Sequence, residues 1–207
     1  QQPAKQSISR ALKPLFRVLL DVFGPVRWPS AQYHYVYLIG WWCEATGMRF
    51  VQGVKTHTEL IVESWNQRLR ASLRFVVGEI EIIRTDGASE FAGSEWPSYL
   101  ADCLIKPERS VPYDPTQMGG VERGWGVNTP DARCMLACCD ALGKSHWYTS
   151  IRHAFFLDNV RQTRPAQSID GTTSEASPFE RMYLRVANYL KHDGAAFRIG
   201  IPAPDLV

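Results

Sequence analysis

The stretch that decides the fold runs from Ser110 to Arg123 and reads S-V-P-Y-D-P-T-Q-M-G-G-V-E-R. Its first half is predicted to be extended, because Pro112 and Pro115 each push the preceding residue out of the helical region of backbone space. A polar turn and two glycines follow, and the stretch ends on an acidic residue next to a basic one. We therefore expect an extended approach that turns into a helix, with Glu122 close to the start of that helix.

Two aspartates upstream end apolar runs that are typical of buried strands. Asp21 ends L-F-R-V-L-L-D, and Asp86 ends I-E-I-I-R-T-D. The 64 residues from 22 to 85 separate the two aspartates, and the 35 residues from 87 to 121 separate Asp86 from Glu122. Taken singly, each acid is better explained as a solvated surface residue. Taken together, two aspartates at strand ends and a glutamate on a helix predict one cleft that binds a divalent cation.

The ligand chemistry of that cleft points to a particular reaction class. Hard carboxylate oxygens suit Mg²⁺ or Mn²⁺. A pair of such ions, about 3.5–4 Å apart, can clamp the attacking and leaving oxygens of a phosphoryl transfer. The pattern therefore predicts a metal-dependent enzyme that acts on phosphate esters.

Several motifs, taken in order along the chain, resemble the integrase core of Copia-type long-terminal-repeat retrotransposons, within the wider retroviral integrase group. The spacing of 35 residues between the second and third acids is the signature of that family. The motifs cover most of the chain and are L-D-V-F-G-P at Leu20–Pro25, I-I-R-T-D-G-A-S-E-F at Ile82–Phe91, V-P-Y-D-P-T-Q-M-G-G-V-E-R at Val111–Arg123, H-W-Y-T-S-I-R-H-A at His146–Ala154 and S-P-F-E-R-M at Ser177–Met182.

The resemblance implies an α/β ribonuclease H-like fold, in which a mixed five-stranded sheet is flanked by helices. It implies that Asp21, Asp86 and Glu122 are both the catalytic residues and the ligands of a pair of Mg²⁺ or Mn²⁺ ions. The implied reaction trims a DNA 3′ end with water and then joins that 3′ hydroxyl to a target phosphodiester. Phosphate contacts are expected from Lys106, Arg109, Arg123, Arg133 and Lys144, and a polar DNA contact from Gln117. For each of the five cations, ordinary solvated surface charge is an equally good explanation.

The resemblance also implies partners and a domain organisation. The partners are DNA, as element ends and as target, and further copies of the chain in a homo-oligomer. Residues 1–14 are expected to be a linker after an absent zinc-binding module, residues 15–163 the catalytic core, and residues 164–207 a helical and loop extension. The chain is then a fragment of a polyprotein, acting in the nucleus after assembly in cytoplasmic virus-like particles.

Composition sets looser bounds. Hydrophobic residues make up 45% and charged residues 21% of the 207 residues, which is ordinary for a soluble domain. The net charge of +2 does not by itself indicate a nucleic-acid-binding protein, so a DNA-binding surface has to come from local clusters of Lys and Arg. Five cysteines without a C-x-x-C pair indicate a reducing compartment. No apolar run reaches the roughly 18 residues of a membrane span, and no signal peptide is visible.

Periodicity and turn residues predict the order of elements. The expected strands are Leu15–Val22, Tyr33–Trp42, Thr46–Val54, Glu79–Thr85 and Ile105–Val111. The expected helices are His57–Leu73, Ser94–Cys103, one starting at Gly119, Ser145–Val160 and Ser177–Tyr189, with a loop at Arg164–Ala176.

The helix that carries Glu122 is expected to kink or break between Gly124 and Pro130. Gly124 and Gly126 each cost about 1 kcal/mol relative to Ala in a helix interior. Pro130 costs about 3 kcal/mol if it is truly interior, whereas it is favourable just after an N-cap at Thr129. We therefore expect a second helix from Thr129 to about Leu142, and a short, mobile segment around Glu122.

The sequence departs from the family pattern in three motifs. Met118 stands where an Asn is usual, the second motif reads Asp86–Gly87–Ala88, and Trp41–Glu44 replaces an aspartate-rich turn. These departures keep two alternatives open. One is a catalytically decayed or domesticated integrase-like domain that binds nucleic acid or a partner, and the other is a different metal nuclease of the ribonuclease H-like fold.

Overall fold

The structure is a computed structural model, and it describes residues 14–56, 79–86, 91, 95–111, 117–139, 141–161, 166–167, 173–174 and 176–183. The helix expected at His57–Leu73 lies outside the described residues. So do residues 1–13 and everything after Tyr183.

Five strands form one mixed sheet in the order β3-β2-β1-β4-β5. β1 pairs antiparallel with β2, and β2 with β3, whereas β4 is parallel to both β1 and β5. The predicted mixed five-stranded sheet flanked by helices is confirmed. The strands are β1 (Arg17–Phe23), β2 (Tyr37–Cys43), β3 (Arg49–Val54), β4 (Ile82–Thr85) and β5 (Lys106–Arg109).

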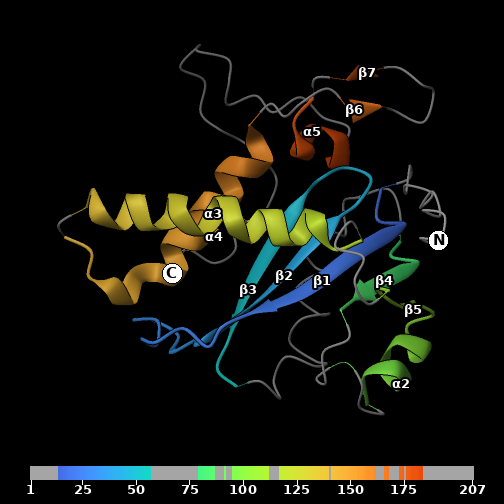
Figure 1. The fold of residues 1–207 in the computed structure, drawn as a ribbon, viewed down its shortest axis with the longest axis horizontal. Helices are drawn as coiled ribbons and strands as arrows, with labels where there is room; N and C mark the ends of the chain where they lie inside the picture. Colours follow the sequence, from blue (N-terminus) through green and yellow to red (C-terminus); the bar gives the residue numbers. More distant parts are fainter. Residues whose placement is uncertain are drawn as a thin grey trace, which may run out of the picture.

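Helices pack beside and across this sheet, as Figure 1 shows. α3 contacts β1 and β2, α4 contacts β3 and α3, and α2 contacts β5. A 3-10 turn, η3 (Lys144–His146), leads directly into α4. The helices are α2 (Glu95–Asp102), α3 (Gly119–Ala137), α4 (Trp147–Val160) and α5 (Pro178–Tyr183).

Alternation along β1 divides the core into two layers, because successive strand side chains point to opposite faces of a sheet. Val18 and Leu20 belong to the layer that includes residues of α2 and α5. Leu19 belongs to the layer beneath α3 and α4. Asp21 shares the parity of Leu19, so its carboxylate is on the α3 face of the sheet.

The predicted break in the helix behind Glu122 is wrong. α3 runs uninterrupted from Gly119 to Ala137 with Pro130 inside it, and Figure 1 draws it as one long helix. Its buried face carries Val121 and Trp125, and burying a large apolar side chain yields about 1.5–3 kcal/mol. Most helical stability in proteins comes from such packing, which here outweighs the low propensity of the glycines and the proline.

Local contacts also relieve the predicted weak point. Pro130 is exposed, and its ring crowds the carbonyl of a residue, Gly126, that has no side chain and faces open space. The side chain of Asn128, which is fully buried, donates from Nδ2 to the Gly124 carbonyl at 2.9 Å. This bond adds a donor at the Gly124 carbonyl, not at the Gly126 carbonyl whose donor Pro130 removes, and the Thr129 N-cap of the prediction is not used.

Replacing Gly126 with Ala is expected to stabilise the protein by about 1 kcal/mol, because Ala has the higher helix propensity. A Cβ at Gly126 would meet no atom within 4 Å, whereas a Cβ at Gly124 would press on the Arg49 side chain at 3.2 Å. Urea unfolding of Gly126→Ala and Gly124→Ala, each compared with wild type, measures the difference in the free energy of unfolding. A loss of stability in Gly126→Ala would show that α3 needs its glycine there for some other reason.

Two smaller differences from the expectations concern the end of α3 and the loop that follows α4. α3 ends at Ala137, five residues before the predicted Leu142. The expected loop at Arg164–Ala176 contains a small antiparallel pair, β6 (Ala166–Gln167) and β7 (Thr173–Ser174).

Among the described residues, no helix combines the length and the apolar character that crossing a membrane requires.

Candidate active site

The first two predicted acids lie side by side at one end of the sheet. β1 and β4 are parallel, and their last paired residues are Leu20 and Thr85. Asp21 and Asp86 are the next residue on each strand path. Because residues level with one another on parallel strands share a face, the sheet itself brings these two side chains to one place.

The third predicted acid comes to the same region from the helix. Glu122 lies in the first turn of α3, where it is exposed to solvent. The amides of Val121 and Glu122 both donate to the Met118 carbonyl, at 3.1 and 3.2 Å. Because α3 packs on β1 and β2, this first turn is held over the strand that carries Asp21.

The electrostatics of Asp21 record the proximity of the other two acids. Burial raises the pKa of Asp21 from its ordinary 3.8 to about 6. Hydrogen bonds from the Val22 amide and the Trp125 indole oppose this rise, while the negative charges of Asp86 and Glu122 add to it. Asp86 and Glu122 therefore both lie close enough to act on the partly buried carboxylate of Asp21.

Stability of the metal-free protein is expected to rise as the pH falls from 7 to 5. The folded state holds a proton on Asp21 up to about pH 6, whereas the unfolded state releases it near 3.8. The folded state therefore binds more protons between these values, and Asp21 adds about 1 kcal/mol to the free energy of unfolding on going from pH 7 to 5.

Urea unfolding at the two pH values, with chelator present, measures this change in wild type and in Asp21→Asn. The difference between the two proteins isolates Asp21 from all other titrating groups. An equal change in both proteins would contradict the raised pKa.

Trp125 is a site residue that the sequence reasoning missed. Its indole Nε1 donates to Asp21 Oδ2 at 3.0 Å, while the Val22 amide donates to Oδ1 at 2.9 Å. The ring is buried, and it stacks on Phe23 and meets the edge of Phe155, both at 5.3 Å between centroids. Residues three apart share a helix face, so the spacing from Glu122 was the available signal.

The three carboxylates are the kind of ligand that a hard divalent cation prefers, but their arrangement is not a preformed metal site. Three carboxylates supply oxygen ligands, and their mutual repulsion is what a cation would relieve. Over the ranges that the structure describes, no three His, Cys, Asp or Glu side chains lie close enough to hold an ion as they stand. A cation would therefore have to draw Asp86 and Glu122 toward Asp21.

The residues predicted to contact DNA are five exposed cations and one glutamine whose side chain is already hydrogen-bonded within the protein. All five cations are exposed: Lys106 and Arg109 at the two ends of β5, Arg123 and Arg133 on α3, and Lys144 in η3. Arg123 acts electrostatically on Arg49 of β3, whose pKa is lowered by burial and by that neighbouring charge. Gln117 instead uses its Oε1 to accept a hydrogen bond from the Val111 amide at 3.0 Å.

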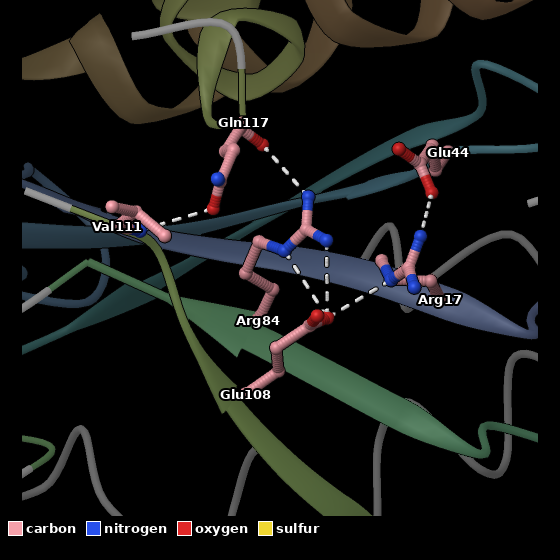
Figure 2. Close-up of polar contacts among 6 residues, drawn as sticks. All are labelled: Arg17, Glu44, Arg84, Glu108, Val111 and Gln117. Atoms are coloured by element: carbon pink, nitrogen blue, oxygen red, sulfur yellow. Dashed lines mark hydrogen bonds and ion pairs between the residues drawn. The ribbon is translucent and has the colours of Figure 1, made fainter. Parts of the chain in front are cut away.

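A buried ion network on the α3 face was also missed, and Figure 2 shows it. Arg17 and Arg84, from the adjacent strands β1 and β4, both bind Glu108 Oε2. Partial burial alone would raise the pKa of Glu108, but hydrogen bonds and charge from Arg84, then Arg17, outweigh it and lower the pKa. An Arg within an otherwise apolar strand was the available signal, because buried cations require partners.

Comparison with solved structures identifies the fold. A chain of the cryoEM structure of the simian T-cell lymphotropic virus intasome in complex with PP2A regulatory subunit B56 gamma matches at a TM-score of 0.63 and 19% identity. The match covers 97% of this chain and 62% of that one, so the present chain spans less than two thirds of it.

Two isolated catalytic cores match nearly over their whole length. The HTLV-2 integrase catalytic core domain in complex with magnesium (trimeric form) gives a TM-score of 0.54 at 23% identity, covering 79% of this chain and 96% of that one. The BIV integrase catalytic core domain gives 0.55 at 16%, covering 82% and 94%. No family model and no curated protein matches the sequence. The chain thus has the ribonuclease H-like fold of retroviral integrase catalytic cores.

Proposed function

We propose that this chain is the catalytic core of a Copia-type retrotransposon integrase, which processes DNA 3′ ends and transfers them to target DNA. The observation that supports the proposal is electrostatic: the charges of Asp86, at the end of β4, and of Glu122, in the first turn of α3, both act on Asp21 of β1. The magnesium complex of the HTLV-2 core supports divalent metal use by this fold.

Asp21, Asp86 and Glu122 would hold the ions in this reading. When bound, a pair of Mg²⁺ or Mn²⁺ ions supplies Lewis-acid activation and stabilises charge on the transferring phosphoryl group. The protein would contribute position, since β1 and β4 pair in parallel just before the two aspartates and α3, which carries the glutamate, packs on β1.

The proposed partners are DNA and further copies of the chain. The exposed cations Lys106, Arg109, Arg123, Arg133 and Lys144 would contact phosphates. The neighbours include an intasome and a trimeric core, which supports assembly into an oligomer. We propose the core at residues 15–163 of a polyprotein, between a linker at 1–14 and an extension at 164–207, acting in the nucleus after particle assembly in the cytoplasm.

A second candidate is an integrase-like domain that binds DNA or a partner without catalysis. The contact between the Trp125 indole and Asp21 Oδ2 favours it, because the indole takes one of the two acceptor sites of that oxygen and so competes with a metal ion for the carboxylate. Oligonucleotide strand transfer in Mg²⁺, Mn²⁺ or chelator separates the two candidates, using this chain with and without an upstream zinc-binding module. Metal-dependent joining supports the first; DNA binding with no joining under any condition supports the second.

A further inference from the structure

A buried guanidinium connects the strand that carries Asp86 to the helix that carries Glu122. Arg84 is 2% exposed and lies two residues before Asp86, on the same face of the sheet. Its Nε donates to Glu108 Oε2 at 3.2 Å, and its second terminal nitrogen binds the same oxygen at 3.2 Å. This two-point contact fixes the plane of the guanidinium between β4 and β5.

The remaining terminal nitrogen of Arg84 reaches out of the sheet. It donates to the backbone carbonyl of Gln117 at 3.4 Å, and Figure 2 shows the guanidinium lying between Glu108 and Gln117. Gln117 directly precedes Met118, the N-cap of α3, which has no side-chain capping bond. The Gln117 side chain turns back to accept the Val111 amide, so the two ends of the approach to α3 are joined at the same point.

We propose that Arg84 is a positioning residue, which sets the start of α3, and with it Glu122, relative to Asp86 on the neighbouring strand. The proposal rests on the proposed function for its catalytic meaning, but the mechanical connection is a property of the fold. One side chain contacts β5 through Glu108 and the helix approach through Gln117. It thereby joins the strand that leads into Asp86 to the segment that leads into Glu122.

Only an arginine side chain can contact Glu108 and the Gln117 carbonyl in this way at the same time. The planar fork of Arg presents several donors in fixed directions, whereas the Lys ammonium is a compact charge on a flexible stem. A Lys at position 84 can keep the charge beside Glu108, but it cannot reproduce the two-point contact and the bond to the Gln117 carbonyl at once. Arg84→Lys therefore removes the connection to α3 while leaving a cation in the network.

Arg17 provides a matched control within the same network. It is 8% exposed, binds the same Glu108 oxygen at 3.0 Å and binds Glu44 Oε2 at 2.9 Å. Its ion pairs tie β1 to β5 and to the end of β2, away from Gln117, as Figure 2 shows. Arg17→Lys therefore perturbs the same partly buried carboxylate without breaking the connection to α3.

The test measures hydrogen exchange at the Val121 and Glu122 amides, and Mn²⁺ binding by electron paramagnetic resonance, in wild type, Arg84→Lys and Arg17→Lys. In Arg84→Lys we expect exchange at these two amides to speed up about tenfold, and Mn²⁺ affinity to fall about 10- to 100-fold, as for other residues that orient metal ligands. Arg17→Lys is expected to change neither by more than about twofold at the same overall stability.

Equal changes in both variants, in proportion to lost stability, would overturn the proposal, and so would unchanged exchange in Arg84→Lys. If Arg84→Lys does not fold, Arg84→Met with Glu108→Leu replaces the pair by apolar groups and takes the same measurements. A wild type that binds no Mn²⁺ would count against the proposed function alone. The exchange comparison would still decide whether Arg84 holds the start of α3.

Discussion

Asp86→Asn is expected to lower strand transfer by at least about 10²–10³-fold, the loss that follows removal of one transition-state charge contact. The amide keeps the shape of the side chain and the pairing of β4 with β1, but it removes the charge that would hold a divalent cation. Joining of a labelled oligonucleotide to target DNA in Mg²⁺, compared at matched protein concentration, measures the effect.

Asp102→Asn is the matched control, because Asp102 is an exposed aspartate at the end of α2. Its activity should equal that of wild type. Thermal unfolding of both variants separates loss of chemistry from loss of folding. Wild-type joining by Asp86→Asn would remove Asp86 from the catalytic set and leave the proposed function without its central ligand.

Gly120→Ala is expected to destabilise the protein by about 3 kcal/mol, at the upper end of the cost of overpacking a core. A Cβ at Gly120 would fall inside the ring of Trp42, a residue of β2. The indole is only partly buried, but it packs against the apolar layer beneath α3, so moving it aside costs that packing. The helix would have to lift from the sheet two residues before Glu122.

Gly119→Ala is the control for this variant, because a Cβ at Gly119 would meet nothing within 4 Å. It should equal or slightly exceed wild type in stability, since Ala is the better helix former. Urea midpoints of the three proteins measure the contrast. Similar stability in both variants would mean that Trp42 moves aside freely, and that the packing of α3 is looser than the structure shows.

The backbone of the fold could be predicted from the sequence because its signals are local. The apolar runs that end at Asp21 and Asp86 gave strands within a few residues of β1 and β4, and Ser145–Val160 gave α4. The fold class itself came from the family resemblance, and the order of the predicted elements agrees with it. The positions of the acids at element ends could be predicted for the same reason.

What could not be predicted depends on contacts between residues far apart in the chain. Pro130 lowers helix propensity locally, and only the burial of Trp125 against the sheet shows why α3 continues through it. The partner of Arg84 is 24 residues away in Glu108, and that of Trp125 is 104 residues away in Asp21. Sequence periodicity carries no information on such pairs.

The departures at Met118 and Trp42 also become intelligible only in three dimensions. Both side chains belong to the apolar layer beneath α3, Met118 buried within it and Trp42 packed against it. Residues that departed from the family pattern thus serve as packing under the helix that carries Glu122. The substitutions at Met118 and Trp42 affect packing and leave the three acids in place. They therefore count less against catalysis than the change of residue type suggests.

β2 and α3 each place a tryptophan ring against a glycine of the other element. Trp42 of β2 fills the space over Gly120 of α3, and Trp125 of α3 fills the space over Gly40 of β2. Each bulky ring requires a glycine on the opposite element, so the glycine of a pair cannot be replaced while its ring is present. Descendants of this chain should inherit Trp42 with Gly120, and Trp125 with Gly40, as two covarying units. A lineage that loses one ring is free to replace its glycine, and the order of those two changes is fixed, with the ring shrinking first.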